Sequence, residues 1–117
     1  MKQLCFKMLF LSFISLSFVA CQKDTTSTTQ APLSELATRG KGVYLSNCIA
    51  CHHPDPKLNG SIGPAVYGSS LELLTKRIME AKYPEGYKPK RESAMMPAFP
   101  QLKNDLESLH AYLNSQK

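Results

Sequence analysis

Residues 48–52 read Cys-Ile-Ala-Cys-His, and this short motif decides how the rest of the chain is interpreted. Two thiols three residues apart can form thioether bonds to the two vinyl groups of a haem, and an imidazole directly after them can present a ring nitrogen to the iron. The motif therefore predicts one covalently bound haem c, attached through Cys48 and Cys51, with His52 as an axial ligand.

Paired cysteines also occur in redox dithiols, structural disulfides and zinc sites. A redox dithiol usually follows a strand and opens a helix, which is not the pattern here. A zinc site of four thiolates needs a second cysteine pair. The chain has four cysteines, but Cys5 and Cys21 lie in an N-terminal segment that we expect to be separate from the folded body. A haem-free thiol-disulfide oxidoreductase or metal module stays as a rival interpretation.

A six-coordinate haem needs a second axial ligand from another part of the chain. Met96 precedes Pro97 in a stretch, residues 84–100, that contains four prolines and little capacity for regular structure. Its soft thioether suits haem iron and raises the reduction potential. Met95 is adjacent, so the pattern leaves two candidates, of which we favour Met96.

Apolar residues at helical spacing predict three helices, separated by loops rich in proline and glycine. The expected ranges are 34–50, 69–83 and 104–115. Ser34 is placed to cap the first helix, and Ser69 and Asn104 each begin a capping-box pattern with a glutamate three residues later. The residues expected on the buried faces are Leu36, Gly40, Val43, Tyr44, Leu71, Leu74, Ile78, Leu106, Leu109 and Leu113.

With these motifs in order, the chain from Leu36 to Leu113 resembles a class I cytochrome c. Gly40 and Tyr44 match the N-terminal helix of that family, where the glycine permits close approach of the C-terminal helix. Leu109 and Tyr112 match the residues packed against them. The resemblance implies an all-α fold: a small cytochrome c fold with three main helices and long loops wrapped around one covalent haem.

The resemblance also implies roles for two loops. Gly63-Pro64 matches the turn in which the proline carbonyl accepts a hydrogen bond from the proximal histidine, so Pro64 would orient His52. Residues 96–99, Met-Pro-Ala-Phe, match the distal-ligand motif of bacterial members. The chain departs from many relatives in having no glycine between Gly86 and Met96.

The N-terminus predicts an export signal and a lipid anchor. Two lysines precede an apolar run over residues 9–19 that is too short to cross a bilayer, so residues 1–20 are interpreted as a signal peptide. Residues 18–21, Phe-Val-Ala-Cys, resemble a lipobox, which implies lipidation of Cys21. Ordinary cleavage with a free Cys21 is the alternative. Residues 21–33 would then be a lipidated, disordered tether and residues 34–117 the cytochrome c domain.

These observations predict a single-electron carrier and not an enzyme, because histidine and methionine together leave no open position on the iron. It would serve an extracytoplasmic respiratory or redox chain, lipid-anchored to a bacterial membrane and facing the periplasm. The alternatives are a haem enzyme or a gas or redox sensor with a displaceable methionine, or an electron-entry subunit of a larger oxidoreductase.

The expected partners are redox proteins that meet a monomeric domain, and not nucleic acid. The formal net charge of +5 falls when the signal peptide leaves with Lys2 and Lys7, and two haem propionates would offset much of the rest. Lys88, Lys90 and Arg91 crowd the loop ahead of Met96. They could steer an acidic redox partner, or they could simply be solvated.

Overall fold

Helix α1 comprises Glu35–Asn47 and begins where the sequence predicted. The structure, a computed structural model, describes residues 32–115. The Ser34 hydroxyl accepts a hydrogen bond from the Ala37 amide at 3.2 Å, which satisfies one of the free N–H groups of the first turn. The helix ends at Asn47, three residues before the predicted end, and the Cys48 amide still donates to the Tyr44 carbonyl. The cysteine motif therefore begins at the helix end.

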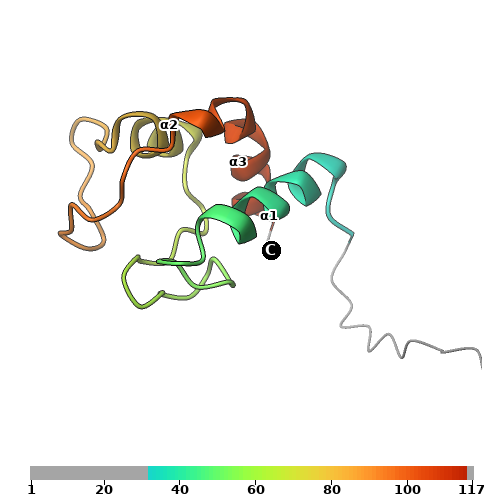
Figure 1. Ribbon diagram of the computed structural model, residues 1–117, viewed down its shortest axis with the longest axis horizontal. Helices are drawn as coiled ribbons and strands as arrows, with labels where there is room; N and C mark the ends of the chain where they lie inside the picture. Colours follow the sequence, from blue (N-terminus) through green and yellow to red (C-terminus); the bar gives the residue numbers. More distant parts are fainter. Residues whose placement is uncertain (1–31, 116–117) are drawn as a thin grey trace, which may run out of the picture. The chain divides into compact units, whose positions relative to one another are not determined.

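Helix α3, Leu106–Ser115, packs across α1, and Figure 1 shows the two helices crossing. Their close approach depends on Gly40, because a β-carbon at that position would overlap the Ser108 backbone carbonyl. Tyr44 of α1 and Tyr112 of α3 pack beside this crossing with ring centroids 5.6 Å apart. The predicted role of Gly40 in helix packing is confirmed.

The start of the C-terminal helical segment differs from the prediction. A 3-10 helix, η1, covers Pro100–Asp105 and leads directly into α3. Asn104 lies inside η1 and does not cap a helix. The reason is Pro100, whose fixed φ favours the first position of a helical turn and starts the segment four residues earlier.

Helix α2, Leu71–Glu80, is shorter at both ends than the predicted range of 69–83. Its N-cap is Ser70, whose hydroxyl accepts a hydrogen bond from the Leu73 amide at 3.2 Å. Ser69, the predicted cap, instead donates its hydroxyl to the Val66 carbonyl at 2.6 Å. The helix ends because Ala81 adopts a left-handed conformation with φ 56°.

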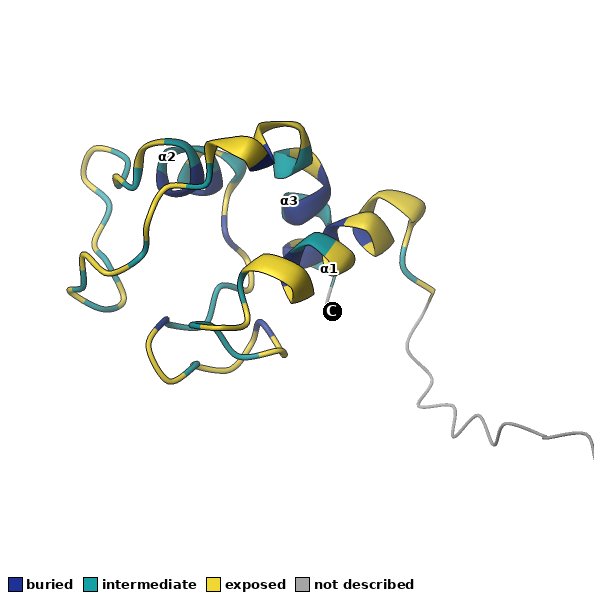
Figure 2. Ribbon diagram, in the orientation of Figure 1, coloured by how far each residue is buried: buried dark blue, intermediate teal, exposed yellow. Residues whose placement is uncertain are grey.

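The core lies around α3, which contacts both α1 and α2, and the dark blue segments of these three helices mark it in Figure 2. One prediction on α1 is wrong: Leu36 is 48% exposed, and Ala37, one residue later, is 1% exposed. The contact of Gly40 with α3 sets the buried stripe, which is therefore Ala37, Gly40 and Tyr44. The buried apolar residues are Ala37, Tyr44, Leu74, Ile78, Leu102, Leu109, Tyr112 and Leu113.

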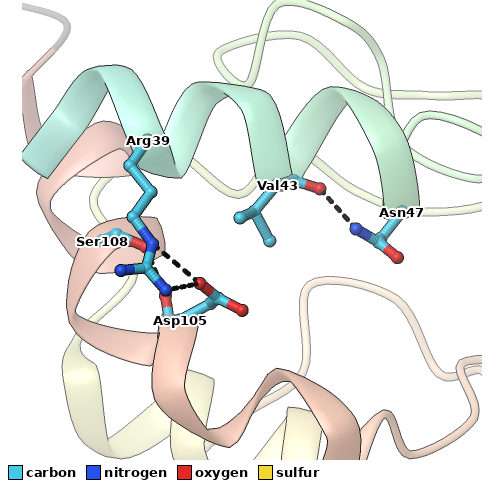
Figure 3. Close-up of polar contacts among 5 residues, drawn as sticks. All are labelled: Arg39, Val43, Asn47, Asp105 and Ser108. Atoms are coloured by element: carbon cyan, nitrogen blue, oxygen red, sulfur yellow. Dashed lines mark hydrogen bonds and ion pairs between the residues drawn. The ribbon is translucent and has the colours of Figure 1, made fainter.

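An ion pair at the surface also joins the helical segments. Arg39 of α1 donates two hydrogen bonds, at 3.0 and 2.7 Å, to one carboxylate oxygen of Asp105 at the end of η1 (Figure 3). Between residues 32 and 115 the structure has three α-helices, one 3-10 helix and no strand, so the all-α fold with three main helices is confirmed. Within the same range, no helix is long and apolar enough to cross a membrane.

Candidate functional site

A cavity brings together segments that are far apart in the sequence. The end of α1, the cysteine motif, the loop after it, α2 and the loop before η1 all contribute to its wall. Figure 1 shows the loop after the cysteine motif, in green, and the loop before η1, in orange, as long segments without helix. All five residues predicted to bind a cofactor line the cavity: Cys48, Cys51, His52, Pro64 and Met96. Most other lining residues are apolar or aromatic, among them Val66, Leu74, Ile78, Tyr83, Phe99 and Leu109.

The cysteine motif forms a turn that continues from α1. The amides of Cys51 and His52 both donate to the Cys48 carbonyl, at 3.2 and 2.9 Å. This turn lets both sulfur-bearing residues line the same cavity, and both thiols are free. Burial, and secondly the charge of Cys51, raises the pKa of the Cys48 thiol to about 11. Catalytic cysteines in such motifs have a lowered thiol pKa, so the raised pKa of Cys48 counts against the oxidoreductase interpretation.

The other haem-free interpretation, a metal module, lacks a set of ligands in the part of the chain that the structure describes. No group of three or more histidine, cysteine, aspartate or glutamate side chains between residues 32 and 115 could hold a metal ion. Cys5 and Cys21 lie outside this range.

The loop that follows the cysteine motif holds the His52 ring through its Nδ1 atom. Its Nδ1 lies 2.8 Å from the Pro64 carbonyl oxygen. Because a carbonyl only accepts, Nδ1 is the donor in this contact, and Nε2 is the ring nitrogen left to bind a metal. Gly63 is required beside this contact, since a β-carbon there would overlap the imidazole ring. The ring orientation is therefore fixed by one hydrogen bond and one close backbone contact.

The two adjacent methionines differ in burial. Met95 is 68% exposed, whereas Met96 is half-buried and packs against the core cluster. Both residues reach the cavity wall. The loop that carries them is fixed at its end by the Phe99 amide, which donates to the Ile78 carbonyl of α2 at 2.6 Å.

Arg77 is a residue of the site that the sequence interpretation missed. It lies on α2, lines the cavity and is only 8% exposed. Its guanidinium lies 4.3 Å from the Tyr83 ring centroid and donates to the Ala81 carbonyl. Within residues 32–115 it forms no ion pair with a carboxylate. The signal was present, because Arg77 follows Leu74 by three residues and so lies on an otherwise apolar helix face.

The basic residues ahead of Met96 are not equivalent. Lys90 donates to the Ala65 carbonyl and Arg91 to the Ile62 carbonyl, each at 2.8 Å. Lys88 is exposed and has no side-chain hydrogen bond or ion pair to any other residue of the range 32–115. Two of the three cations thus contact the loop that carries Pro64, a contact that sequence spacing does not encode.

The residues around this cavity fit a covalent haem. Two free thiols lie on one turn, an imidazole has one nitrogen bonded and the other free, and a thioether lies on the same wall. The lining is largely apolar, as a porphyrin requires. The Arg77 cation, which pairs with no carboxylate among residues 32–115, suits the carboxylates that a haem carries.

Comparison with known families agrees with this chemistry. The family model described as Cytochrome c matches residues 37–117, which is more than half of the chain. Comparisons with curated proteins and with solved structures found no match.

Proposed function

The chain belongs to the cytochrome c family, and from this premise we propose that it is a single-electron carrier with one covalently bound haem c. The family indicates haem-based electron transfer. The observation that carries the proposal is the cavity whose wall contains both cysteines, the His52 ring with Nδ1 already bonded to Pro64, and Met96.

Each residue of the wall has a part in this proposal. Cys48 and Cys51 form the thioether bonds. His52 binds the iron through Nε2, because Nδ1 donates to the Pro64 carbonyl, and that hydrogen bond fixes the ring and raises its basicity. Met96 would hold the iron through its thioether sulfur, since it packs against the core while Met95 is mostly exposed. When bound, haem supplies an iron centre that changes its charge by one electron.

Arg77 has an electrostatic role in this proposal. Its guanidinium is buried and has no carboxylate partner among residues 32–115, so it is suited to pair with a haem propionate. A buried cation on the wall of the haem cavity would also favour the reduced, less positive state of the iron. The residue thereby contributes to affinity for the cofactor and to the reduction potential.

Electron carriage is preferred to catalysis because His52 and Met96 would together hold the iron and leave no position open for a substrate. A haem enzyme or a gas or redox sensor needs a position that opens easily. The remaining alternative, an electron-entry subunit of a larger oxidoreductase, would use the same site. Stable binding of the chain to such a complex would distinguish this subunit from an independent carrier.

Location and partners complete the proposal. Members of the cytochrome c family are usually extracytoplasmic. Residues 1–20 as a signal peptide and Cys21 as a lipidated residue fall outside the range that the structure describes, and we propose both on the sequence pattern. The chain would then meet redox proteins, as a monomeric domain on the periplasmic side of a bacterial membrane.

An absorption spectrum of protein matured in a host that attaches c-type haem tests the proposal. Haem that survives denaturing extraction, together with the far-red band of methionine-ligated ferric iron, is the expected result. Met96→Ala should keep covalent haem, lose this band, lower the reduction potential and bind carbon monoxide, while Met95→Ala should behave as wild type. Covalent haem without the band in wild-type protein would favour the enzyme or sensor, and absence of haem would refute the proposal.

A further inference from the structure

Two loops on the cavity wall carry the proposed axial chemistry. We call residues 59–66 the proximal loop, because Pro64 contacts His52, and residues 82–99 the distal loop, because it carries Met96. Every carbonyl from residue 62 to residue 65 of the proximal loop accepts a hydrogen bond. Gly63 accepts from the Gly60 amide and Pro64 from His52. Ile62 accepts from Arg91 and Ala65 from Lys90, both of the distal loop.

The distal loop has few other connections to the domain. Between residues 88 and 98, the remaining hydrogen bonds join the loop to itself: the Ser93 amide donates to the Arg91 carbonyl, and the Met95 amide to the Ser93 hydroxyl. Among the hydrogen bonds of residues 32–115, only those of Lys90 and Arg91 join this eleven-residue stretch to another part of the fold. Met96 lies between these two bonds and the next attachment, the Phe99 amide that donates to the Ile78 carbonyl at 2.6 Å: it follows Arg91 by five residues and precedes Phe99 by three.

From this juxtaposition we infer that Lys90 and Arg91 are positioning residues, which hold the distal loop on the proximal loop and keep the Met96 sulfur on the iron. The inference rests on the proposed function, in which His52 and Met96 are the axial ligands. It gives the two basic residues a part other than steering a partner. The carbonyls that they contact lie on either side of Pro64. The same short loop therefore accepts the hydrogen bond that orients His52 and the two hydrogen bonds that hold the loop of Met96.

The physical reason is local opening. A loop with few hydrogen bonds to the rest of the fold opens with a lower free energy than a well-connected one, and a ligand on such a loop leaves the metal as often as the loop opens. Hydrogen bonds from a charged donor to a carbonyl are stronger than neutral ones. Removing both should therefore increase the population of protein whose sixth iron position is free, without changing the covalent attachment.

The test uses the haem-loaded protein and a set of matched variants. Lys90→Met, Arg91→Met and the double variant remove the donors and keep most of the side-chain length, while Lys90→Arg keeps a cationic donor. Lys88→Met removes the same charge from an exposed residue of the same loop that forms no such bond. Two readouts report ligation without any partner protein: the far-red band of the ferric protein and the rate of carbon monoxide binding to the ferrous protein.

The double variant should bind carbon monoxide roughly tenfold faster than wild type, with a smaller increase in each single variant and a weaker far-red band. Lys90→Arg should recover most of the wild-type rate, and Lys88→Met should match wild type. Hydrogen exchange should show faster exchange of the amides of residues 88–98 in the double variant, with the helices unchanged.

Two results would overturn the inference. A double variant with the wild-type carbon monoxide rate, band and amide exchange would show that the loop does not need these bonds. An equal effect of Lys88→Met would assign the change to charge alone. Failure of the proposed function looks different, because the wild-type protein itself would then lack the far-red band and bind carbon monoxide readily, which removes the basis of the inference as well.

Discussion

Gly40 lies against the backbone of Ser108 so closely that the position has no room for a β-carbon. Any larger residue must separate α1 from α3, and with them the buried pair of Tyr44 and Tyr112. Gly40→Ala should therefore lower the free energy of unfolding of the haem-loaded protein by about 3 kcal/mol, the upper range for an overpacked core. Urea unfolding followed by circular dichroism measures this loss.

Gly42 provides the matched control for this prediction. It lies on the same helix, is exposed, and has no atom within 4 Å of an added β-carbon. Alanine is the better helix former, so Gly42→Ala should raise the free energy of unfolding by about 0.5–1 kcal/mol. Two alanine variants of opposite sign on one helix would support the packing argument, and similar effects of both would refute it.

Gly63→Ala should disturb the proposed iron ligand and leave the helices intact. An added β-carbon would overlap the His52 ring, which is already bonded to Pro64 at 2.8 Å. The ring must tilt, which weakens the hydrogen bond or the bond to iron. We expect retained covalent haem with a shifted absorption spectrum and a changed reduction potential, as measured by redox titration. Ser61→Ala, an exposed change in the same loop, should leave both unchanged.

Arg77→Met should lower the reduction potential by an amount on the order of 50 mV, because loss of a buried cation from the wall of the haem cavity favours the ferric state. Lys76→Met removes the same charge from the adjacent residue, whose ammonium pairs with Glu80 at the surface at 2.9 Å, where solvent screens it. The reduction potential of Lys76→Met should therefore stay close to that of wild type. Arg77→Lys keeps the charge, so its reduction potential should fall between those of Arg77→Met and wild type. Equal shifts at positions 76 and 77 would contradict a specific effect.

The features that sequence predicted well are local in origin. The N-cap Ser34 and the turn of residues 48–52 depend on contacts within a few residues, and a short pattern encodes them. The helix boundaries were less accurate where two patterns competed. Ser69 and Ser70 are both good caps, and the Val66 carbonyl, which binds the Ser69 hydroxyl, decides between them.

The features that sequence missed depend on contacts between distant residues. The buried stripe of α1 passes through Ala37 and not through the larger Leu36, because the contact of Gly40 with α3 sets the rotation of the helix. Lys90 and Arg91 bind carbonyls 25 and 29 residues away, and no spacing rule encodes such a contact. Sequence could identify the chemical groups of the site but not the bonds that hold its two loops together.

Tyr44 gives the protein a dependence of stability on alkaline pH. It is 1% exposed and its hydroxyl donates to the His53 carbonyl at 2.7 Å. Burial, and secondly the charge of Cys48, raises the pKa of Tyr44 well above its usual value. Because the folded pKa exceeds the unfolded one, the full stability is present below about pH 10. Above that pH the unfolded chain loses a proton that the folded protein keeps, so the free energy of unfolding falls.

Tyr44→Phe should be less stable than wild type at pH 7, and this difference should become smaller at alkaline pH. At pH 7 the substitution should lower the free energy of unfolding by about 1 kcal/mol, because the His53 carbonyl loses its hydrogen-bond donor. Above about pH 10 the variant has one fewer group that ionises only on unfolding, so its difference from wild type should shrink as the pH rises. Burial also raises the pKa of Tyr112, so some decline in stability should remain in Tyr44→Phe. Urea unfolding from about pH 8 to about pH 11 measures both effects. A difference between the two proteins that stays constant over this range would show that Tyr44 does not cause the decline.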